Sequence, residues 1–257
     1  AYGEDNDYFS FLIQQYLQSA TNNAAIKSIS DLIYGQGLCI DGLEKDSAQV
    51  KELRKLINHR DLKKVILERK MLGMAAMQII YSKAGNNRKV VGIKHFPIHT
   101  LRPEKMNAEG VIENYYYHPN WIDKSPSDTL KKIPTFGNSK EAIELFILKP
   151  YISGYSYFSP VGSKGQKVIV AFNENADSKA TVEDISLNDA PAHYEYLANE
   201  AMHKILVGHR VTSPMLLGIK GGGNGLASNS DEIMVASQLF NSTVIRNFQD
   251  EILDALE

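Results

Sequence analysis

HRVTSPMLLG (His209–Gly218) is the stretch that says most about the fold of this 257-residue chain. Pro214 and Gly218 suit a turn, because proline fixes φ and glycine adopts backbone conformations that other residues avoid. The sequence on either side carries apolar residues at helical spacing. We therefore expect the stretch to join a helix at Ala190–Val207 to a long helix at Asn229–Leu256.

The N-terminal part of the chain shows the same helical periodicity. Apolar residues recur every three or four positions in Asp7–Ala20, Asn23–Tyr34 and Ser47–Leu72. These spacings predict three helices, and Asn6 or Asp7 could cap the first of them.

The middle of the chain has the shorter periods of β-strands. Ala75–Tyr81 and Lys89–Phe96 flank the turn sequence KAGNN and predict a hairpin. The region Ile122–Ser139 is rich in Pro, Ser, Asp and Lys, which predicts a loop. Further strands are expected at Gly110–His118, Ala142–Leu148, Lys167–Phe172 and Thr181–Ile185. This order favours an α+β chain over a doubly wound sheet.

Composition narrows the classes of function. The net charge is −2, whereas a sequence-independent DNA binder usually has a strong basic excess. Cys39 is the only cysteine, which argues against a disulfide framework, and we expect a buried structural thiol. No apolar run is long enough to span a bilayer, and the acidic start AYGEDNDYF does not resemble a secretory signal. We expect a soluble protein that is intracellular at synthesis.

The sequence contains none of the catalytic or metal-binding motifs considered below in complete form. The loop GIKGGGNGLAS (Gly218–Ser228) lacks the order of glycine, lysine and serine or threonine that a P-loop needs to cradle phosphates. His203 and His209 are six residues apart, which does not place two ligands on one helix face. No HExxH, CxxC or GxSxG pattern occurs. We expect neither a catalytic site nor a metal or cofactor, and we expect the protein not to be an enzyme.

Two features allow a binding role as well as a structural one. A basic face runs along Ser47–Leu72, and such a face is usually solvated, although it is also a weak sign of nucleic-acid contact. Its candidate residues are Lys51, Arg54, Lys55, Lys63 and Lys64. Tyr115–Tyr117 could stack on bases, but a strand with alternating buried and half-buried rings is the favoured interpretation.

Several segments, in their order along the chain, resemble tailed-bacteriophage portal proteins. His209-Arg210-Val211 and the following SPMLLG resemble the portal stretch in which a helix ends in a Pro-Leu-Leu-Gly turn. A Gly/Asn-rich loop and DEIMVASQLFNSTVIRNFQDEILDAL then resemble the next portal helix. LERKMLGMAAMQIIYSKAG, FPIHTLRPEKMNAEGVIENYYYHPNW and KPYISGYSYFSPV resemble portal segments upstream. The resemblance covers most of the chain from about Gly35 onward.

One segment departs from the family pattern. In portal proteins the Tyr-Phe-Ser-Pro segment leads into a long helical section, but here Val161 is followed at once by Gly162-Ser163-Lys164-Gly165 and the sequence KVIVAF. This is typical of a shortened chain bridged by a Gly-Ser junction. By analogy, residues 1–72 correspond to helices of a wing-like region, 73–160 to a stem- or clip-like β region, and 161–257 to a wing- or crown-like core.

The resemblance implies a mechanical role. Portal proteins form a dodecameric ring at one capsid vertex of the virion, after assembly in the host cytoplasm. DNA passes through the channel during packaging and ejection, and terminase, capsid or scaffolding protein and tail-connector proteins bind the ring. A conduit should not grip DNA, because each neutralised phosphate adds affinity. The alternatives are another head–tail connector or capsid protein, or an intracellular enzyme of unrecognised type.

Two hypotheses about sites follow from the resemblance. A head-to-tail ring needs two different complementary patches on each subunit, and the acidic start (Glu4, Asp5, Asp7) could pair with the basic face. The glycine loop could line the channel and touch DNA. Its candidate residues are Lys220, Gly221, Gly222, Gly223 and Asn224.

Overall fold

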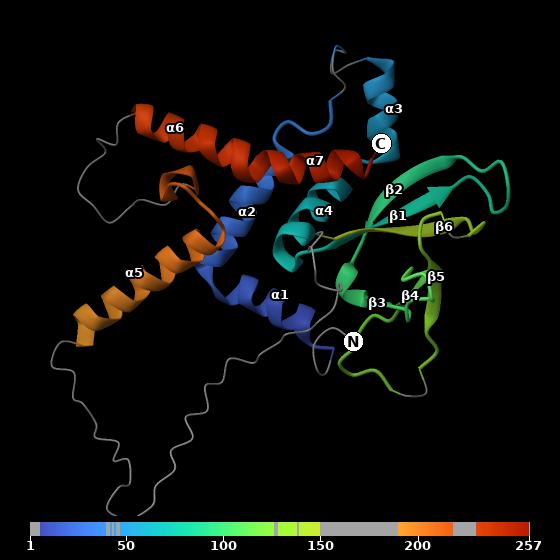
Figure 1. Cartoon of the computed structure of the whole chain (residues 1–257), viewed down its shortest axis with the longest axis horizontal. Helices are drawn as coiled ribbons and strands as arrows, with labels where there is room; N and C mark the ends of the chain where they lie inside the picture. The colour runs from blue at the N-terminus through green and yellow to red at the C-terminus, as the bar shows by residue number, and fades with distance from the viewer. Residues whose placement is uncertain are drawn as a thin grey trace, which may run out of the picture.

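The computed structural model describes residues 6–39, 42, 44, 47–125, 128–137, 139–149, 190–217 and 230–256. Helices come first, strands follow, and helices end the chain (Figure 1). The N-terminal helices are α1 (Tyr8–Gln18), α2 (Ala20–Tyr34), α3 (Ala48–Leu56) and α4 (His59–Leu72). The strands are β1 (Ala75–Tyr81), β2 (Val90–Phe96), β3 (Leu101–Pro103), β4 (Asn114–Tyr117), β5 (Lys131–Pro134) and β6 (Ile143–Leu148). The expected α+β class is confirmed.

The strands form two small antiparallel sheets. Sheet A has the order β2-β1-β6, and sheet B has the order β3-β4-β5. In sheet A, Ile79 of β1 lies opposite Ile93 of β2 and Glu144 of β6. The two sheets meet at a parallel bridge between Thr135 and Leu145. The predicted hairpin at β1 and β2 is confirmed.

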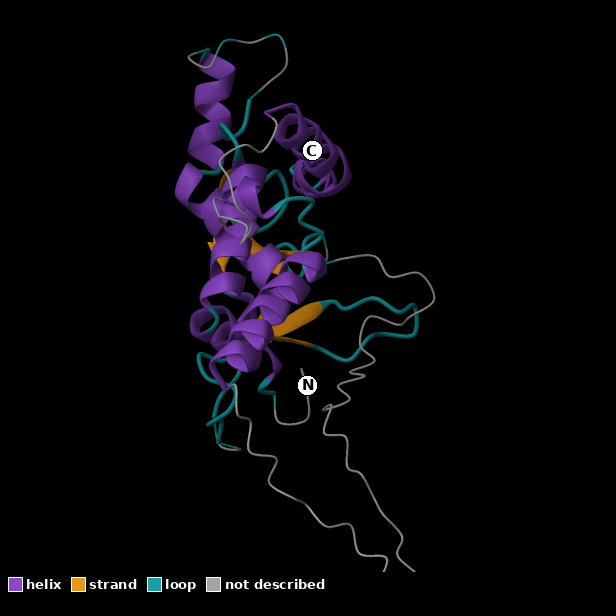
Figure 2. Cartoon of the chain, turned by 90° about the vertical axis from the view of Figure 1, so that its left-hand side faces the viewer, coloured by secondary structure: helices purple, strands orange, loops and turns teal. Residues whose placement is uncertain are grey.

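The central strand of sheet A, β1, is covered on both faces because its side chains alternate between two cores. Met77 and Ile79 pack with helix residues such as Val65 and Phe240 in the first core. Ala76 lies in the second core with residues of α1 and sheet B. Viewed from the left of Figure 1, the helices stand in front of the strands (Figure 2). Sheet A is therefore the element that connects the helical part to sheet B.

Two predicted helix boundaries are wrong. Ser19 is extended (φ −100°, ψ 108°), so α1 ends at Gln18, and the Ser19 side chain accepts a hydrogen bond from the Asn22 N–H at the start of α2. The predicted helix Ser47–Leu72 is two helices. Ile57 is extended and forms a bridge to Ile93, and Asn58 then caps α4. In both places a local cap or a strand contact outweighs the apolar periodicity.

The predicted loop Ile122–Ser139 contains a strand. β5 pairs with β4, with Ile133 opposite Tyr115. Four residues ending in proline give little local signal, and the pairing depends on a partner elsewhere in the chain. Tyr115–Tyr117 lie in β4 as expected, with Tyr115 buried and the other two rings partly buried.

The C-terminal helices agree with the prediction apart from one irregularity. α5 (Ala190–Gly208) is followed by a short 3₁₀ turn at Pro214–Leu217. The last helix runs as α6 (Ser230–Phe240), a π-helical turn at Asn241–Ile245 and α7 (Arg246–Asp254). The strands predicted at Lys167–Phe172 and Thr181–Ile185 lie outside the described residues.

Candidate functional site

The segment after α5 is a turn with an unusual residue at its centre. The Arg210 N–H donates to the Val207 carbonyl (2.9 Å) and the Val211 N–H to the Leu206 carbonyl (3.0 Å), the pattern of a Schellman helix end. Arg210 has φ 60°, in the left-handed region where glycine is usual. The expected turn is confirmed, with Pro214 opening the 3₁₀ turn. Gly218 lies outside the described residues.

His209 is held as a neutral side chain at this turn. Its Nε2 lies 2.9 Å from the Asn22 Oδ1 of α2. Burial, followed by the positive charge of Lys70, lowers the pKa of His209 to about 4. Its ring-nitrogen contact is with an amide and not with a carboxylate. The arrangement fixes the end of α5 against α2.

Lys70 lies at the same junction and is also partly removed from water. Burial first, and then the charges of Arg69 and Arg210, lower the pKa of Lys70 to about 8. Its ammonium group is 5.3 Å from the centre of the Phe248 ring on α7. A cation over an aromatic face is stabilised by the ring electrons, so Phe248 partly compensates for the lost hydration.

Arg69 connects α4 to the C-terminal helix. Its Nε and Nη2 lie 2.8 and 2.9 Å from the two carboxylate oxygens of Glu251, a bidentate pair. Its Nη1 donates to the Gly73 carbonyl at the end of α4 (2.9 Å). The Gln249 side chain also donates to the Ile33 carbonyl of α2 (3.0 Å). Together these contacts anchor α7 to the helical core.

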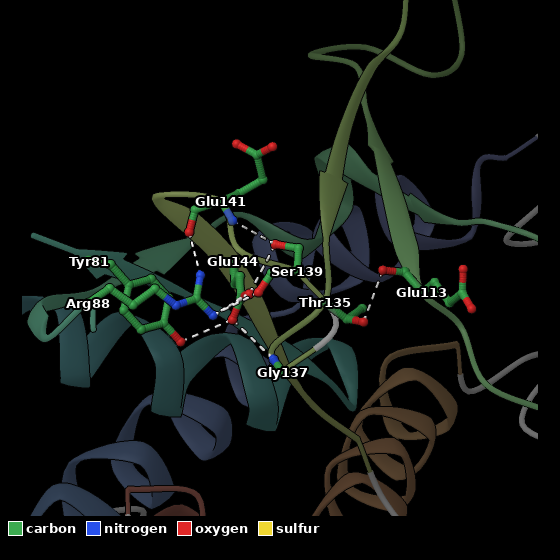
Figure 3. A network of polar contacts seen from close by, with 8 residues as sticks. All are labelled: Tyr81, Arg88, Glu113, Thr135, Gly137, Ser139, Glu141 and Glu144. Carbon is green, nitrogen blue, oxygen red and sulfur yellow. Dashed lines mark hydrogen bonds and ion pairs between the residues drawn. The ribbon is translucent and has the colours of Figure 1, made fainter. Parts of the chain in front are cut away.

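A second polar network surrounds Glu144 of β6, whose side chain is fully buried (Figure 3). Arg88, from the β1–β2 loop, donates to one carboxylate oxygen (2.8 Å), and so does Ser139 (3.0 Å). The Tyr81 hydroxyl and the Gly137 N–H donate to the other oxygen, each at 3.0 Å. The Arg88 guanidinium also lies 3.7 Å from the Tyr81 ring centre. The network ties the hairpin loop to the segment before β6.

Glu144 stays ionised despite its burial. Burial by itself raises the pKa of this carboxyl, but the hydrogen bonds from Arg88, Gly137, Tyr81 and Ser139 outweigh it, and the pKa is lowered. Both oxygens are saturated by donors, so the group is poorly placed to accept a proton from a substrate. The arrangement therefore suits a residue that holds the hairpin loop in place better than one that acts in general acid–base catalysis.

The residues of the predicted basic face are exposed on two helices. Lys51, Arg54 and Lys55 lie on α3, and Lys63 and Lys64 lie on α4. The break at Ile57 separates the two groups. Lys63 is 4.5 Å from the Tyr34 ring centre, so its charge already has a contact within the chain.

Two other predicted sites have different outcomes. Cys39 is exposed, so the expectation of a buried thiol is wrong. It borders a hollow of about 560 Å³ that Leu38 and Leu53 also line. The predicted channel loop, Lys220–Asn224, lies outside the described residues.

A groove of about 650 Å³ separates β5 from the start of β6. The rings of Phe96 and Tyr117 form part of its wall, edge to face with their centres 5.6 Å apart. Its polar lining consists of Gln78, Asn114, Lys131, Lys132, Ser139 and Glu141, and the side chains of Lys131, Lys132 and Glu141 are exposed. Apolar walls with a few polar groups are typical of a recognition site.

Large apolar side chains are exposed on the helices farthest from the sheets. Tyr194 and Leu197 of α5 are 72% and 57% exposed, and Met234 and Val235 of α6 are 55% and 60% exposed. Both helices extend away from the rest of the fold (Figure 1). A monomeric protein rarely exposes clustered apolar side chains, so such clusters indicate interaction surfaces.

Within the described ranges, no three His, Cys, Asp or Glu side chains are grouped so that they could hold a metal ion. None of the helices in the same ranges has both the length and the apolar character that crossing a membrane requires. No protein-family model matches the sequence, and no curated protein matches it.

Proposed function

We propose that this chain is a non-enzymatic subunit of a phage portal ring at the capsid vertex, through which DNA is packaged and ejected. In this proposal the chain binds other copies of itself, terminase, capsid or scaffolding protein and tail-connector proteins, both in the virion and in the host cytoplasm during assembly. The main alternative is another head–tail connector with a similar helical and β composition.

The observation that carries the proposal is the exposed apolar surface on α5 and α6. Tyr194, Tyr196 and Leu197 are each more than half exposed, as are Met234 and Leu239. Exposing these side chains to water is unfavourable, and burying them against another protein removes that cost. Exposed apolar surfaces of this kind are typical of a subunit that assembles with other proteins, and they are rare in monomeric proteins.

The sequence supports the choice of a portal among assembling proteins. The resemblance includes the turn after α5 and the helix that follows it, and that helix carries the exposed side chains of Met234, Val235 and Leu239. The net charge of −2 suits a conduit through which DNA must slide. The pairing of the acidic start with the basic face, and the contact of the glycine loop with DNA, stay predictions.

Native mass spectrometry of the purified chain tests this proposal. A portal subunit should give one discrete oligomer of twelve copies, or of a neighbouring ring size, and light scattering should give the same mass in solution. A chain that remains monomeric at tens of micromolar would contradict the proposal.

A matched pair of variants checks that the exposed helices cause the assembly. Leu197→Ser together with Val235→Ser should reduce the oligomer, because each substitution removes apolar surface from an exposed helix. Val91→Ser changes a comparably exposed side chain on β2 (53%) and should leave the oligomer unchanged. Equal loss in both variants would count against a specific role for α5 and α6.

A further inference from the structure

The groove between β5 and β6 has a closed end and an open end. The Phe136 N–H donates to the Leu145 carbonyl (2.8 Å), which joins the two strands at the closed end. Toward the other end the strands separate, and Lys131, Lys132 and Ile143 lie along the opening. Ile143 is 36% exposed, so an apolar edge is available to a partner.

Strand geometry also directs backbone groups into this opening. The Thr135 N–H donates to the Glu113 carbonyl across sheet B, and the Tyr81 N–H donates to the Ala142 carbonyl across sheet A. Because successive peptide groups point in opposite directions along a strand, those of Lys132 and Ile143 face the groove. The opening therefore offers donors and acceptors beside an apolar wall.

The exposed face of α5 has the matching chemistry. Tyr194, Leu197, Ala198 and Ala201 have the spacing that places side chains on one helix face, and all four are exposed. Glu195 lies beside this stripe and is also exposed. The stripe presents an aromatic ring with a hydroxyl group, an aliphatic side chain and a neighbouring negative charge.

We propose that the α5 stripe of one copy docks into the β5–β6 groove of the next copy. The inference rests on the proposed ring and identifies two of its contact surfaces. Tyr194 and Leu197 enter the groove against Phe96 and Tyr117, and Glu195 pairs with Lys131 at the rim. A second copy is the occupant because the aromatic and apolar walls of the groove and the charge of Lys131 have counterparts on one exposed face of this chain.

The positions of the two surfaces suit a ring. α5 and the β5–β6 region lie on opposite sides of the fold in Figure 1. A contact between two different surfaces of identical chains leaves one free surface of each kind at the ends, so further copies add until the rotation between neighbours closes a ring. A symmetric dimer would instead bury one surface against its own copy.

The area of the stripe sets its share of the interface. A fully exposed aromatic side chain has about 200 Å² to bury, so Tyr194, at 72% exposure, can contribute about 140 Å². A standard interface covers about 800 Å² per partner. The stripe is therefore an anchor within a larger interface, and tyrosine is a common residue in such anchors.

Cysteine cross-linking tests the contact directly. Cys39 is the only native cysteine and is first replaced in a Cys39→Ser background. Leu197→Cys with Ile143→Cys should then give, on mild oxidation, a ladder of covalent oligomers under denaturing conditions. Leu197→Cys with Val91→Cys is the matched control, because Val91 lies on β2 at the other edge of sheet A, and it should give no ladder.

Exchanging the charges of Glu195 and Lys131 provides a second test. A misfolded single variant would not regain its affinity in the double variant, so recovery would reflect the ion pair. Glu195→Lys alone and Lys131→Glu alone should each weaken association by about fivefold, since a rim ion pair contributes up to about 1 kcal/mol. The double exchange should restore the affinity. Equal weakening in the double variant would overturn the pairing. An intact oligomer without cross-links at the 143–197 pair would overturn this inference alone, whereas a monomeric wild-type chain would overturn the proposed function as well.

Discussion

Replacing Glu144 by alanine should lower the free energy of unfolding by about 4 kcal/mol, because removing one member of a buried ion pair costs about 3 to 5 kcal/mol. The Arg88 side chain is only 15% exposed, so water cannot readily replace the lost carboxylate. The Tyr81 hydroxyl and the Gly137 N–H lose an acceptor at the same time, at about 1 kcal/mol each. Arg88 keeps its hydrogen bond to the Ser139 carbonyl, which limits the total loss.

Urea unfolding followed by the fluorescence of Trp121, the single tryptophan, measures this loss. Lys204→Ala is the control, because it removes the exposed Glu200–Lys204 pair and should change stability by less than about 0.5 kcal/mol. Arg88→Met combined with Glu144→Leu should be less destabilising than Glu144→Ala, since it leaves no unpaired buried charge. A loss below about 1 kcal/mol in Glu144→Ala would refute the structural role of the network.

The same network predicts a pH dependence. The folded state lowers the pKa of Glu144, so the unfolded chain binds more protons at acidic pH. The stabilisation is therefore complete above the ordinary carboxyl pKa and is lost as the pH falls through the lowered value. The difference in unfolding free energy between wild type and Glu144→Leu should shrink over that acidic range. A constant difference would show that the carboxylate charge does not contribute.

Three further predictions concern the α5 turn. His209 should stay neutral down to about pH 5 in NMR titrations, and a titration near pH 6.5 would contradict the burial of its ring. As the pH falls from 6.5 toward 4, the wild-type chain should lose stability relative to His209→Asn, because His209 binds a proton in the unfolded state and not in the folded state. Lys70 should titrate near pH 8, so wild type should gain stability between pH 8 and 10.5 relative to Lys70→Met; parallel pH profiles would be inconsistent with this. Arg210→Gly should raise the free energy of unfolding by about 1 kcal/mol, and Arg210→Val should lower it, because glycine adopts the left-handed conformation of residue 210 most easily. Chemical denaturation measures both changes, and a valine variant more stable than the glycine variant would exclude a left-handed conformation at this position.

The elements that could be predicted from the sequence have a strong local signal. The α5 turn, the β1–β2 hairpin and the long C-terminal helix combine regular apolar spacing with turn residues. The failures lie where a distant partner decides the structure. Ile57 interrupts a periodic helix because it forms a bridge to Ile93, and β5 exists because β4 pairs with it.

The polar networks were less predictable than the fold. Glu144 had a usable signal, since alternation along β6 places it on the same face as Phe146 and Leu148, and a carboxylate on an apolar face is rarely buried without a partner. The identity of that partner, Arg88, depends on the hairpin loop folding back. The contacts of Lys70 and Arg69 with Phe248 and Glu251 join segments about 180 residues apart, and no local pattern indicates them.

Negative-stain electron microscopy of the purified chain tests the central claim most directly. The account predicts closed rings of uniform diameter with a central pore, formed by repeated contact between two different surfaces of each copy. Fields that contain only particles the size of a single chain, at a concentration where light scattering confirms a monomer, would contradict it.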